Sequence, residues 1–219
     1  MAVRELVPGI EGSALALSLV EVADSGWTVG EAARDSLFFV VSGAGSLTLG
    51  DESHTLAEGS AALVLAGEEG IVAADDGPLS LLHATVGQEA DRHAPLGPRE
   101  PVVGIDSVVS KDATGARSYR VLFGPENGST RATLFAGYLP PGRAPWHFHL
   151  YDEIVWVREG SARLHLAERV EEIEAGSAFR LRPRQVHIVE NASAERELSV
   201  LGIFTPAGSP SAAYLAPAP

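Results

Sequence analysis

The chain has 219 residues, of which 45% are hydrophobic and 21% charged, as in a globular protein of one or two domains. Its formal net charge of −13 at pH 7 disfavours nucleic acids and anionic membrane surfaces as partners. Because the chain has no cysteine, it cannot form disulfides or use thiolate ligands, and any metal must be held by histidine, carboxylate or carbonyl groups.

We do not expect residues 1–9 to form a signal peptide, because no basic stretch leads into an apolar run and Pro8 and Gly9 interrupt the segment. No later stretch approaches the roughly 18–20 uninterrupted apolar residues of a membrane-spanning helix. We therefore expect a cytoplasmic protein without membrane or nucleic-acid partners. The negative charge lies almost wholly in residues 1–100, which carry 4 Arg against 16 Asp and Glu.

Short apolar runs of strand length follow one another along the chain, separated by glycine and proline. They are Ser36–Val41, Ser60–Leu65, Leu79–Val86, Ala132–Leu139, Ile154–Val157 and Leu198–Phe204. No apolar stripe with the helical period of 3.6 residues persists for more than about four turns. The pattern predicts an all-β sandwich or barrel with little helix.

An internal repeat relates the two halves of the chain, since Ser36–Leu49 resembles Glu153–Leu166 at a constant offset of 117 residues. The same offset relates two pairs of turn glycines, Gly43 with Gly160 and Gly59 with Gly176. We expect two copies of one β unit, at residues 1–90 and 105–206. Residues 91–104 would form a linker, and residues 207–219 a tail rich in proline, alanine and serine.

Three histidines and one glutamate in the second copy form a candidate metal site. His147 and His149 are two residues apart, so on a strand both imidazoles point to the same face. Glu153 follows after a short turn, and His187 lies in a later strand. Three neutral imidazoles and one carboxylate suit one divalent transition metal per chain, such as Fe, Mn, Ni or Zn. Octahedral coordination would leave two positions for water, oxygen or a chelating substrate.

Residues 142–160 and 176–191 resemble the two signature motifs of the cupin superfamily. The matching residues are His147, His149, Glu153 and Gly160 in the first motif and Gly176, His187 and Asn191 in the second. Gly142 stands one residue late, and Arg182 and Arg184 occupy the positions of the usual proline and glycine. The resemblance implies two tandem cupin barrels, each a jelly roll (double-stranded β-helix), and the four residues above as metal ligands.

The first copy lacks this ligand set, because the positions 117 residues earlier are Gly30, Ala32, Ser36 and Gly70. We expect a degenerate barrel without a metal site. It would pack against the second barrel, cover its mouth or provide the surface of a homodimer.

Several side chains near the predicted metal are candidates for substrate contact or catalysis. Phe135, Val155 and Val157 would form apolar walls of the pocket. Arg180 and Arg182 share a strand face. If they point into the barrel, they would bind a substrate carboxylate. If they point outward, which is the placement that we favour, they would neutralise the acidic first half of the chain. Arg182 is therefore only a conditional substrate-binding candidate.

Tyr151 and Glu153 are the catalytic candidates, Tyr151 as a proton donor at the pocket mouth, although turn tyrosines are common. His165 alternates with leucines and is predicted to be exposed, while His54, His83 and His93 are interpreted as structural.

The preferred hypothesis is a metal-dependent, dioxygenase-like oxidoreductase that acts on a small organic substrate. For cupins with all four ligands, the resemblance implies dioxygenases, decarboxylases and isomerases, and fold alone does not choose among them. Oxygen chemistry is favoured because the predicted walls are apolar and no acid–base pair stands beside the ligands. The alternatives are a non-redox isomerase or decarboxylase, a small-molecule-binding protein without turnover, and a storage role.

Overall fold

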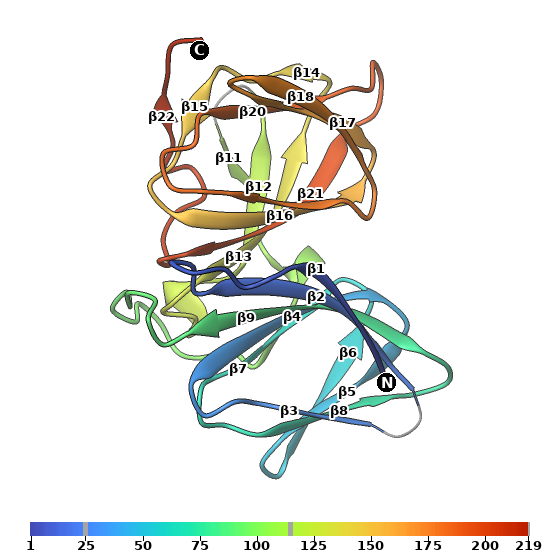
Figure 1. Cartoon of the computed structure of the whole chain (residues 1–219). Coiled ribbons are helices and arrows are strands. Elements are labelled where there is room, and N and C mark those ends of the chain that lie inside the picture. The colour runs from blue at the N-terminus through green and yellow to red at the C-terminus, as the bar shows by residue number, and fades with distance from the viewer. Residues whose placement is uncertain (24–25, 114–115, 219) are drawn as a thin grey trace.

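The computed structural model describes residues 1–23, 26–113 and 116–218, which form two β structures joined in tandem (Figure 1). The strands of the N-terminal half are β1 (Ala2–Val7), β2 (Leu15–Val22), β3 (Trp27–Val29), β4 (Arg34–Ser42), β5 (Ala44–Leu49), β6 (Glu52–Ala57), β7 (Ser60–Val64), β8 (Gly70–Ala74), β9 (Leu79–Gly87) and β10 (Val102–Gly104).

The strands of the C-terminal half are β11 (Lys111–Asp112), β12 (Ser118–Phe123), β13 (Thr133–Leu139), β14 (Gly142–Arg143), β15 (His147–Phe148), β16 (Asp152–Glu159), β17 (Ser161–Leu166), β18 (Arg169–Glu174), β19 (Ala178–Leu181), β20 (His187–Asn191), β21 (Leu198–Thr205) and β22 (Tyr214–Leu215). Two 3-10 turns, η1 (Ile105–Ser107) and η2 (Pro125–Asn127), are the helical elements of the described ranges. Neither could cross a membrane.

Both halves have the same strand order, so the structure confirms an all-β fold of two tandem jelly-roll barrels. The sheet order β2-β9-β4-β7 in the first half corresponds to β13-β21-β16-β19 in the second. The second sheets correspond as well, with β8-β5-β6 matching β20-β17-β18. Pairing between neighbouring strands of these sheets is antiparallel.

The turn glycines used to recognise the repeat occupy equivalent left-handed conformations. Gly43 and Gly160 have φ of 89° and 97°, and Gly59 and Gly176 have φ of 83° and 90°. A residue with a Cβ is disfavoured at such angles. Glycine at these positions thus reflects a backbone requirement that both barrels share.

One apolar core joins the two barrels. Ile154 and Trp156 of β16 and Leu37 and Phe39 of β4 belong to the same buried cluster, although the repeat places them in different barrels. The alternate residues of these strands, such as Val155 and Phe38, belong to the separate interior of each barrel. Both strands are therefore buried on both faces, which explains why their sequences are continuously apolar.

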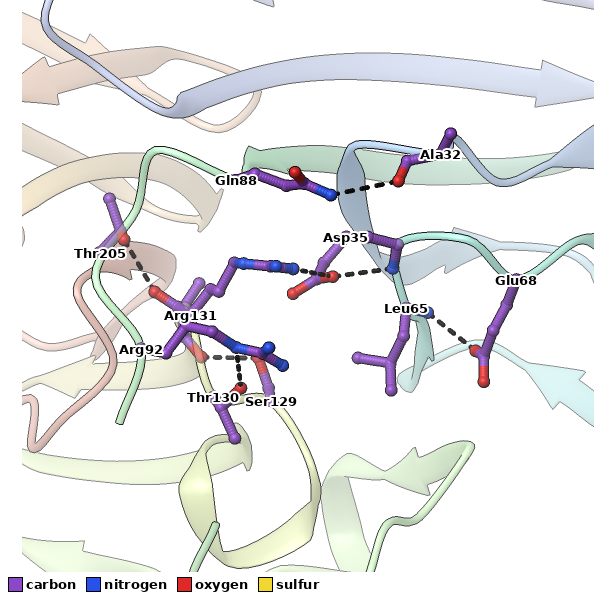
Figure 2. Close-up of polar contacts among 12 residues, drawn as sticks. Ala32, Asp35, Leu65, Glu68, Gln88, Arg92, Ser129, Thr130, Arg131 and Thr205 are labelled. Atoms are coloured by element: carbon purple, nitrogen blue, oxygen red, sulfur yellow. Dashed lines mark hydrogen bonds and ion pairs between the residues drawn. The ribbon is translucent and has the colours of Figure 1, made fainter. Parts of the chain in front are cut away.

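Buried ion pairs flank this shared core at equivalent positions of the repeat. Asp35 binds Arg131 at 2.7 Å across the two halves, and the carboxylate also accepts a hydrogen bond from the Ala66 amide (Figure 2). Asp152, 117 residues after Asp35, binds Arg180 at 2.6 Å and accepts a hydrogen bond from Ser13.

Arg180 points away from the interior of the C-terminal barrel, as expected, but its role is specific. Besides Asp152, its guanidinium donates to the carbonyls of Pro8 and Leu15 at 3.0 and 2.9 Å. Arg180 thereby connects the two barrels. These directed contacts describe the role of Arg180 better than a general neutralisation of the acidic N-terminal half.

Two segments predicted as linker and tail contribute strands. Within the predicted linker, residues 91–101 contain no strand, but β10 at its end pairs with β7 and extends the N-terminal sheet. In the tail, β22 pairs with β15, the strand that carries His147 (Figure 1). The tail therefore forms part of the wall of the C-terminal barrel.

Candidate metal centre

The three predicted histidine ligands come together inside the C-terminal barrel. His147 in β15 and His187 in β20 are direct register partners, and His149 follows β15 by one residue. One ligand atom from each of the three imidazoles lies within 4.8 Å of the others, and all three side chains are buried. Strand pairing thus brings together residues 40 positions apart in the sequence.

Backbone carbonyls fix the orientation of two of these rings. His147 Nδ1 lies 3.0 Å from the Pro145 oxygen, and His187 Nδ1 lies 2.8 Å from the Gln185 oxygen. A carbonyl can only accept a hydrogen bond, so each Nδ1 carries the proton and each Nε2 keeps its lone pair. Histidine ligands of metals are commonly held in this way.

The carboxylate of Glu153 lies beside His149, although it is not among the groups whose ligand atoms all lie within 4.8 Å of one another. Its Oε2 lies 3.1 Å from Nε2 of His149, and the Glu153 side chain is almost fully buried on β16. Gly202 on the neighbouring strand leaves the room for it, because a Cβ there would meet Glu153 Oε1 at 2.9 Å and the Phe135 ring at 2.2 Å.

Burial keeps the imidazoles of the cluster neutral at physiological pH. It lowers the pKa of His149 to about 3 and that of His187 to about 4, assisted by the charges of neighbouring histidines, and it also lowers the pKa of His147. A neutral imidazole is the form that binds a metal. Burial, with a smaller contribution from the charge of Asp152, raises the pKa of Glu153 to about 8.

The residues fit a divalent transition metal. Ligand distances of about 2.0–2.2 Å allow one ion to bridge donor atoms of this spread with small side-chain adjustments. Without a cation, the cluster contains a buried carboxyl of raised pKa and the His149 Nδ1, which is buried without a hydrogen-bond partner among the described protein groups. A positive ion would favour the ionised carboxylate and bind the lone pairs of the neutral imidazoles.

A cavity of about 120 Å³ opens beside this cluster. Phe135 and Val155, predicted as apolar walls, line it, as does Tyr151. The ring of Tyr151 stacks on His149 with centroids 4.3 Å apart, and its hydroxyl donates to the Pro210 carbonyl at 3.3 Å. Burial and the nearby Glu153 charge raise the pKa of Tyr151, so its hydroxyl keeps its proton.

Two of the predicted substrate-contact residues lie elsewhere. Val157 is fully buried in the apolar core of the barrel, two residues beyond Val155 along β16, and it does not line the cavity. Arg182 is exposed and borders a different groove on the outer surface, near Pro8 and Ile10. Val157 therefore does not line the cavity as predicted, whereas Arg182 has the outward placement that the sequence favoured.

The position of His165 also differs from the prediction. It is buried rather than exposed, because its ring contacts Trp146 and its Nε2 pairs with Glu190. Arg163 binds the other oxygen of that carboxylate at 2.9 Å. The alternation of β17 correctly places His165 away from the barrel interior, but neighbouring side chains cover it.

Sequence reasoning missed two groups that line the cavity. One is Arg117, which directly precedes β12. The sequence signal that could have found it is its spacing of two residues from Tyr119, which places both side chains on the same face of an extended chain. The other is the tail segment containing Pro210, Ser211 and Ala213. Its composition gives no sign that it packs over a functional site.

The corresponding region of the N-terminal barrel is filled by aromatic packing. His83 stands where the second barrel has Gly202, and its ring stacks on Phe38 with centroids 4.8 Å apart and meets the edge of Trp27. Its Nε2 lies 3.0 Å from the hydroxyl of Ser36, the counterpart of Glu153. These contacts agree with the interpretation of His83 as structural.

Comparison with known proteins supports the resemblance to cupins. A family model described as "Cupin domain" matches residues 135–204. No curated protein matches the chain.

Solved structures match over nearly the whole chain. A Pseudomonas aeruginosa protein described as glyoxylate-induced has a TM-score of 0.77 at 18% identity, covering 94% of this chain and 81% of that one. A cupin 2 conserved barrel domain protein from Leptotrichia buccalis has a TM-score of 0.66 at 16% identity, with 93% and 89% covered. The oxalate decarboxylase of Bacillus subtilis, which has Mn(II) centres, has a TM-score of 0.75 at 14% identity, with 93% and 71% covered.

At these identities the solved structures show the shared fold alone. Together with the two motifs, the match to the family model shows a cupin domain over residues 135–204, and the solved structures show that a similar fold extends over nearly the whole chain.

Proposed function

We propose that this protein is a metal-dependent enzyme that acts on a small organic molecule in its C-terminal barrel, with dioxygenase-like chemistry as the first candidate. The observation that carries the proposal is the convergence of three buried, neutral imidazoles and one buried carboxyl at a cavity of small-molecule size. A perturbed titratable cluster in an apolar cavity is the usual character of a reaction site.

The residues divide into those that would hold the metal and those that would surround the substrate. His147, His149, His187 and Glu153 would hold the ion, which supplies Lewis-acid chemistry and, if it is redox-active, electron transfer. Phe135 and Val155 present apolar surface that excludes water from the cavity. Tyr151 lies against His149 at the cavity, and its hydroxyl keeps its proton, so it can donate a hydrogen bond to a bound molecule.

A second candidate is a non-redox isomerase or decarboxylase. The position of Tyr151 favours it, since the sequence predicts this residue as a proton donor and its side chain lines the cavity. The apolar walls of the cavity favour the dioxygenase-like reaction. Binding of a small molecule without turnover would use the same cavity.

The metal content of the purified protein tests whether the cluster binds a metal. Purified wild-type protein should contain about one divalent transition metal per chain, and His147→Ala and His187→Ala should lose it. His93→Ala is the matched control, because His93 is exposed and lies outside the cluster. Metal bound equally by the wild type and by both cluster variants would remove the enzyme proposal together with the metal site.

Oxygen uptake separates the two reaction classes. The iron-loaded protein is screened with an oxygen electrode against diketones, catechols and flavonoid-like enols, while the same mixtures are examined for isomerised or decarboxylated products. Oxygen consumption supports the dioxygenase-like reaction. Product formation without oxygen uptake, sensitive to Tyr151→Phe, supports the second candidate, and no reaction of either kind leaves binding as the function.

A further inference from the structure

An arginine-rich groove lies on the outer surface, between the segment after β1 in the first half of the chain and the turn that joins β19 to β20 in the second. It has a volume of about 680 Å³. Its lining includes Arg169, Arg180, Arg182 and Arg184, and none of the described residues that line it is aspartate or glutamate. The groove is therefore a basic surface on a chain whose net charge is −13.

Two of the four guanidinium groups already have carboxylate partners. Arg180 binds Asp152 at 2.6 Å, and Arg169 binds a neighbouring glutamate at 2.9 Å. The exposed side chains of Arg182 and Arg184 form no hydrogen bond or ion pair with the residues that the structure describes. Because arginine stays protonated in proteins, the groove contains two permanent positive charges that no described protein group neutralises.

The backbone of the turn that carries Arg182 and Arg184 is fixed at several points. The Arg182 amide donates to Gln185 Oε1 at 2.9 Å, and the Gln185 amide donates to the Arg182 carbonyl at 3.0 Å. The Arg184 amide donates to the carbonyl of His149 at 2.7 Å. The two arginines therefore extend from a backbone that is already ordered, which lowers the entropic cost of binding a ligand.

Arg184 occupies a position where the backbone favours glycine. Its φ of 65° lies in the left-handed region, and glycine is the usual residue of the cupin motif at this position. The arginine side chain is exposed, so packing in the core does not explain its presence. Residues in costly backbone conformations cluster at sites that bind ligands. This conformation is a second observation, independent of charge, that points to a binding role for the side chain.

The charge and lining of the groove fit a small phosphorylated molecule. A phosphate monoester carries about −1.5 to −2 charges at pH 7, which matches two guanidinium groups. Each guanidinium can bind two phosphate oxygens with parallel hydrogen bonds. Pro8, Ile10 and Pro183 also line the groove and offer apolar surface to the organic part of such a molecule. A long polyanion would extend beyond the groove over an acidic protein and be repelled.

We propose that this groove is a binding site for a phosphorylated small organic molecule, whose phosphate is bound by Arg182 and Arg184. The site is separate from the metal cavity, because the two share no lining residue. It therefore goes beyond the proposed function and does not depend on it. Arg182, with its outward placement, has its ligand on the outer surface of the barrel.

Calorimetric titration of the full-length protein at low ionic strength tests the proposal. The ligands are phenyl phosphate, glycerol 3-phosphate and glucose 6-phosphate, with inorganic phosphate and phenol for comparison. We expect at least one ester to bind the wild type more tightly than inorganic phosphate does, and phenol not to bind. Arg182→Gln and Arg184→Gly should each bind that ester about tenfold more weakly, because each loses a charge-assisted contact.

Arg196→Gln is the matched control, because it removes one exposed arginine outside the groove and should leave ester binding unchanged. Arg184→Gly keeps a residue that adopts the left-handed conformation freely, and thermal denaturation and metal content are measured for each variant, so loss of binding is distinguished from loss of the fold. A wild type that binds none of the esters would overturn the proposal, as would equal ester binding by the wild type and both groove variants. An effect of Arg196→Gln as large as theirs, or inorganic phosphate bound as tightly as every ester, would also overturn it.

Discussion

At the scale of single residues, Arg184 departs from the cupin pattern, whereas Glu153 follows it. Arg184 occupies the usual glycine position of the second motif and has a φ of 65°, a left-handed conformation that few residues with a Cβ adopt. Its amide donates to the carbonyl of His149 at 2.7 Å. The backbone conformation of the motif is thus retained although the residue suited to it is missing.

Replacing Arg184 should therefore stabilise the protein if the new residue is glycine. We expect Arg184→Gly to be more stable than Arg184→Ala by about 1 kcal/mol, because only glycine adopts this φ without a steric penalty. The exposed arginine side chain is lost in both variants, so the difference isolates the backbone. Urea denaturation of the metal-free protein measures it, and a less stable Arg184→Gly would contradict the interpretation.

Glu153 predicts a pH dependence for the metal-free protein. Its pKa is about 8 in the folded state and lies near 4.5 in the unfolded chain, so the folded state binds the extra proton between these values. Stability contributed by this group is fully present below pH 4.5 and is lost as pH rises toward 8. The lowered pKa values of the three histidines act in the opposite direction, since their folded states bind fewer protons below about pH 6.5.

Comparison of the wild type with Glu153→Gln isolates the contribution of Glu153. We expect the free-energy advantage of Glu153→Gln over the wild type to grow between pH 5 and 8 by up to about 3–5 kcal/mol. Metal binding should reverse the order, because glutamine cannot supply a negative ligand. Denaturation curves at several pH values, with chelator and with metal, provide the test; a pH-independent difference in chelator would argue against a raised pKa.

At the scale of elements, the C-terminal tail is the clearest case of a segment that acquires structure from its partner. Gly208 exchanges two hydrogen bonds with the Thr133 side chain. Further on, β22 pairs with β15, and Tyr214 stacks on Phe148 with ring centroids 5.4 Å apart. The segment between these two attachments, including Pro210, lies over the cavity.

Truncation after Gly208 should weaken metal retention without unfolding the barrel. It removes β22 and the residues over the cavity but keeps the Gly208 attachment, so the metal should dissociate into chelator at least several-fold faster. Removal of residues 218–219 alone is the control, because it leaves β22 intact. Equal dissociation rates for the two truncations would show that the tail does not protect the site.

At the scale of the whole molecule, the two barrels are joined by one core and by paired charges. The Asp35–Arg131 pair is almost completely buried, with side-chain exposures of 1% and 9%. Asp35 Oδ2 and Arg131 Nε have no hydrogen-bond partner among the described protein groups (Figure 2). We therefore expect the pair to specify how the halves meet more than it stabilises them.

Comparison of a single and a double variant tests how far this pair stabilises the protein. Asp35→Asn alone should destabilise the protein by about 3 kcal/mol, because Arg131 remains as a buried uncompensated charge. The double variant Asp35→Leu with Arg131→Met should lose much less. Asp106→Asn is the control, since the Asp106 side chain is 96% exposed in its pair with Arg120 and should change stability by less than about 1 kcal/mol. Urea denaturation measures all four proteins, and a double variant as unstable as Asp35→Asn would contradict the prediction.

The sequence by itself determined the features that depend on short-range geometry. The alternation of a strand places His147 and His149 on one side, and the left-handed turns at Gly43 and Gly160 reveal the repeat. The motif spacing identified His187 as their partner, 40 residues away. These properties could be read because strand period and turn conformation are fixed by the local chain.

Only the tertiary structure decided which surfaces cover one another. Arg180 bridges the barrels through Ser13, and Tyr151 meets Pro210, contacts that join residues 167 and 59 positions apart. The burial of His165 and the presence of Arg117 beside the metal cluster likewise arise from packing of distant segments. Such contacts leave no periodic pattern in the sequence, because they depend on how whole sheets and the tail pack together.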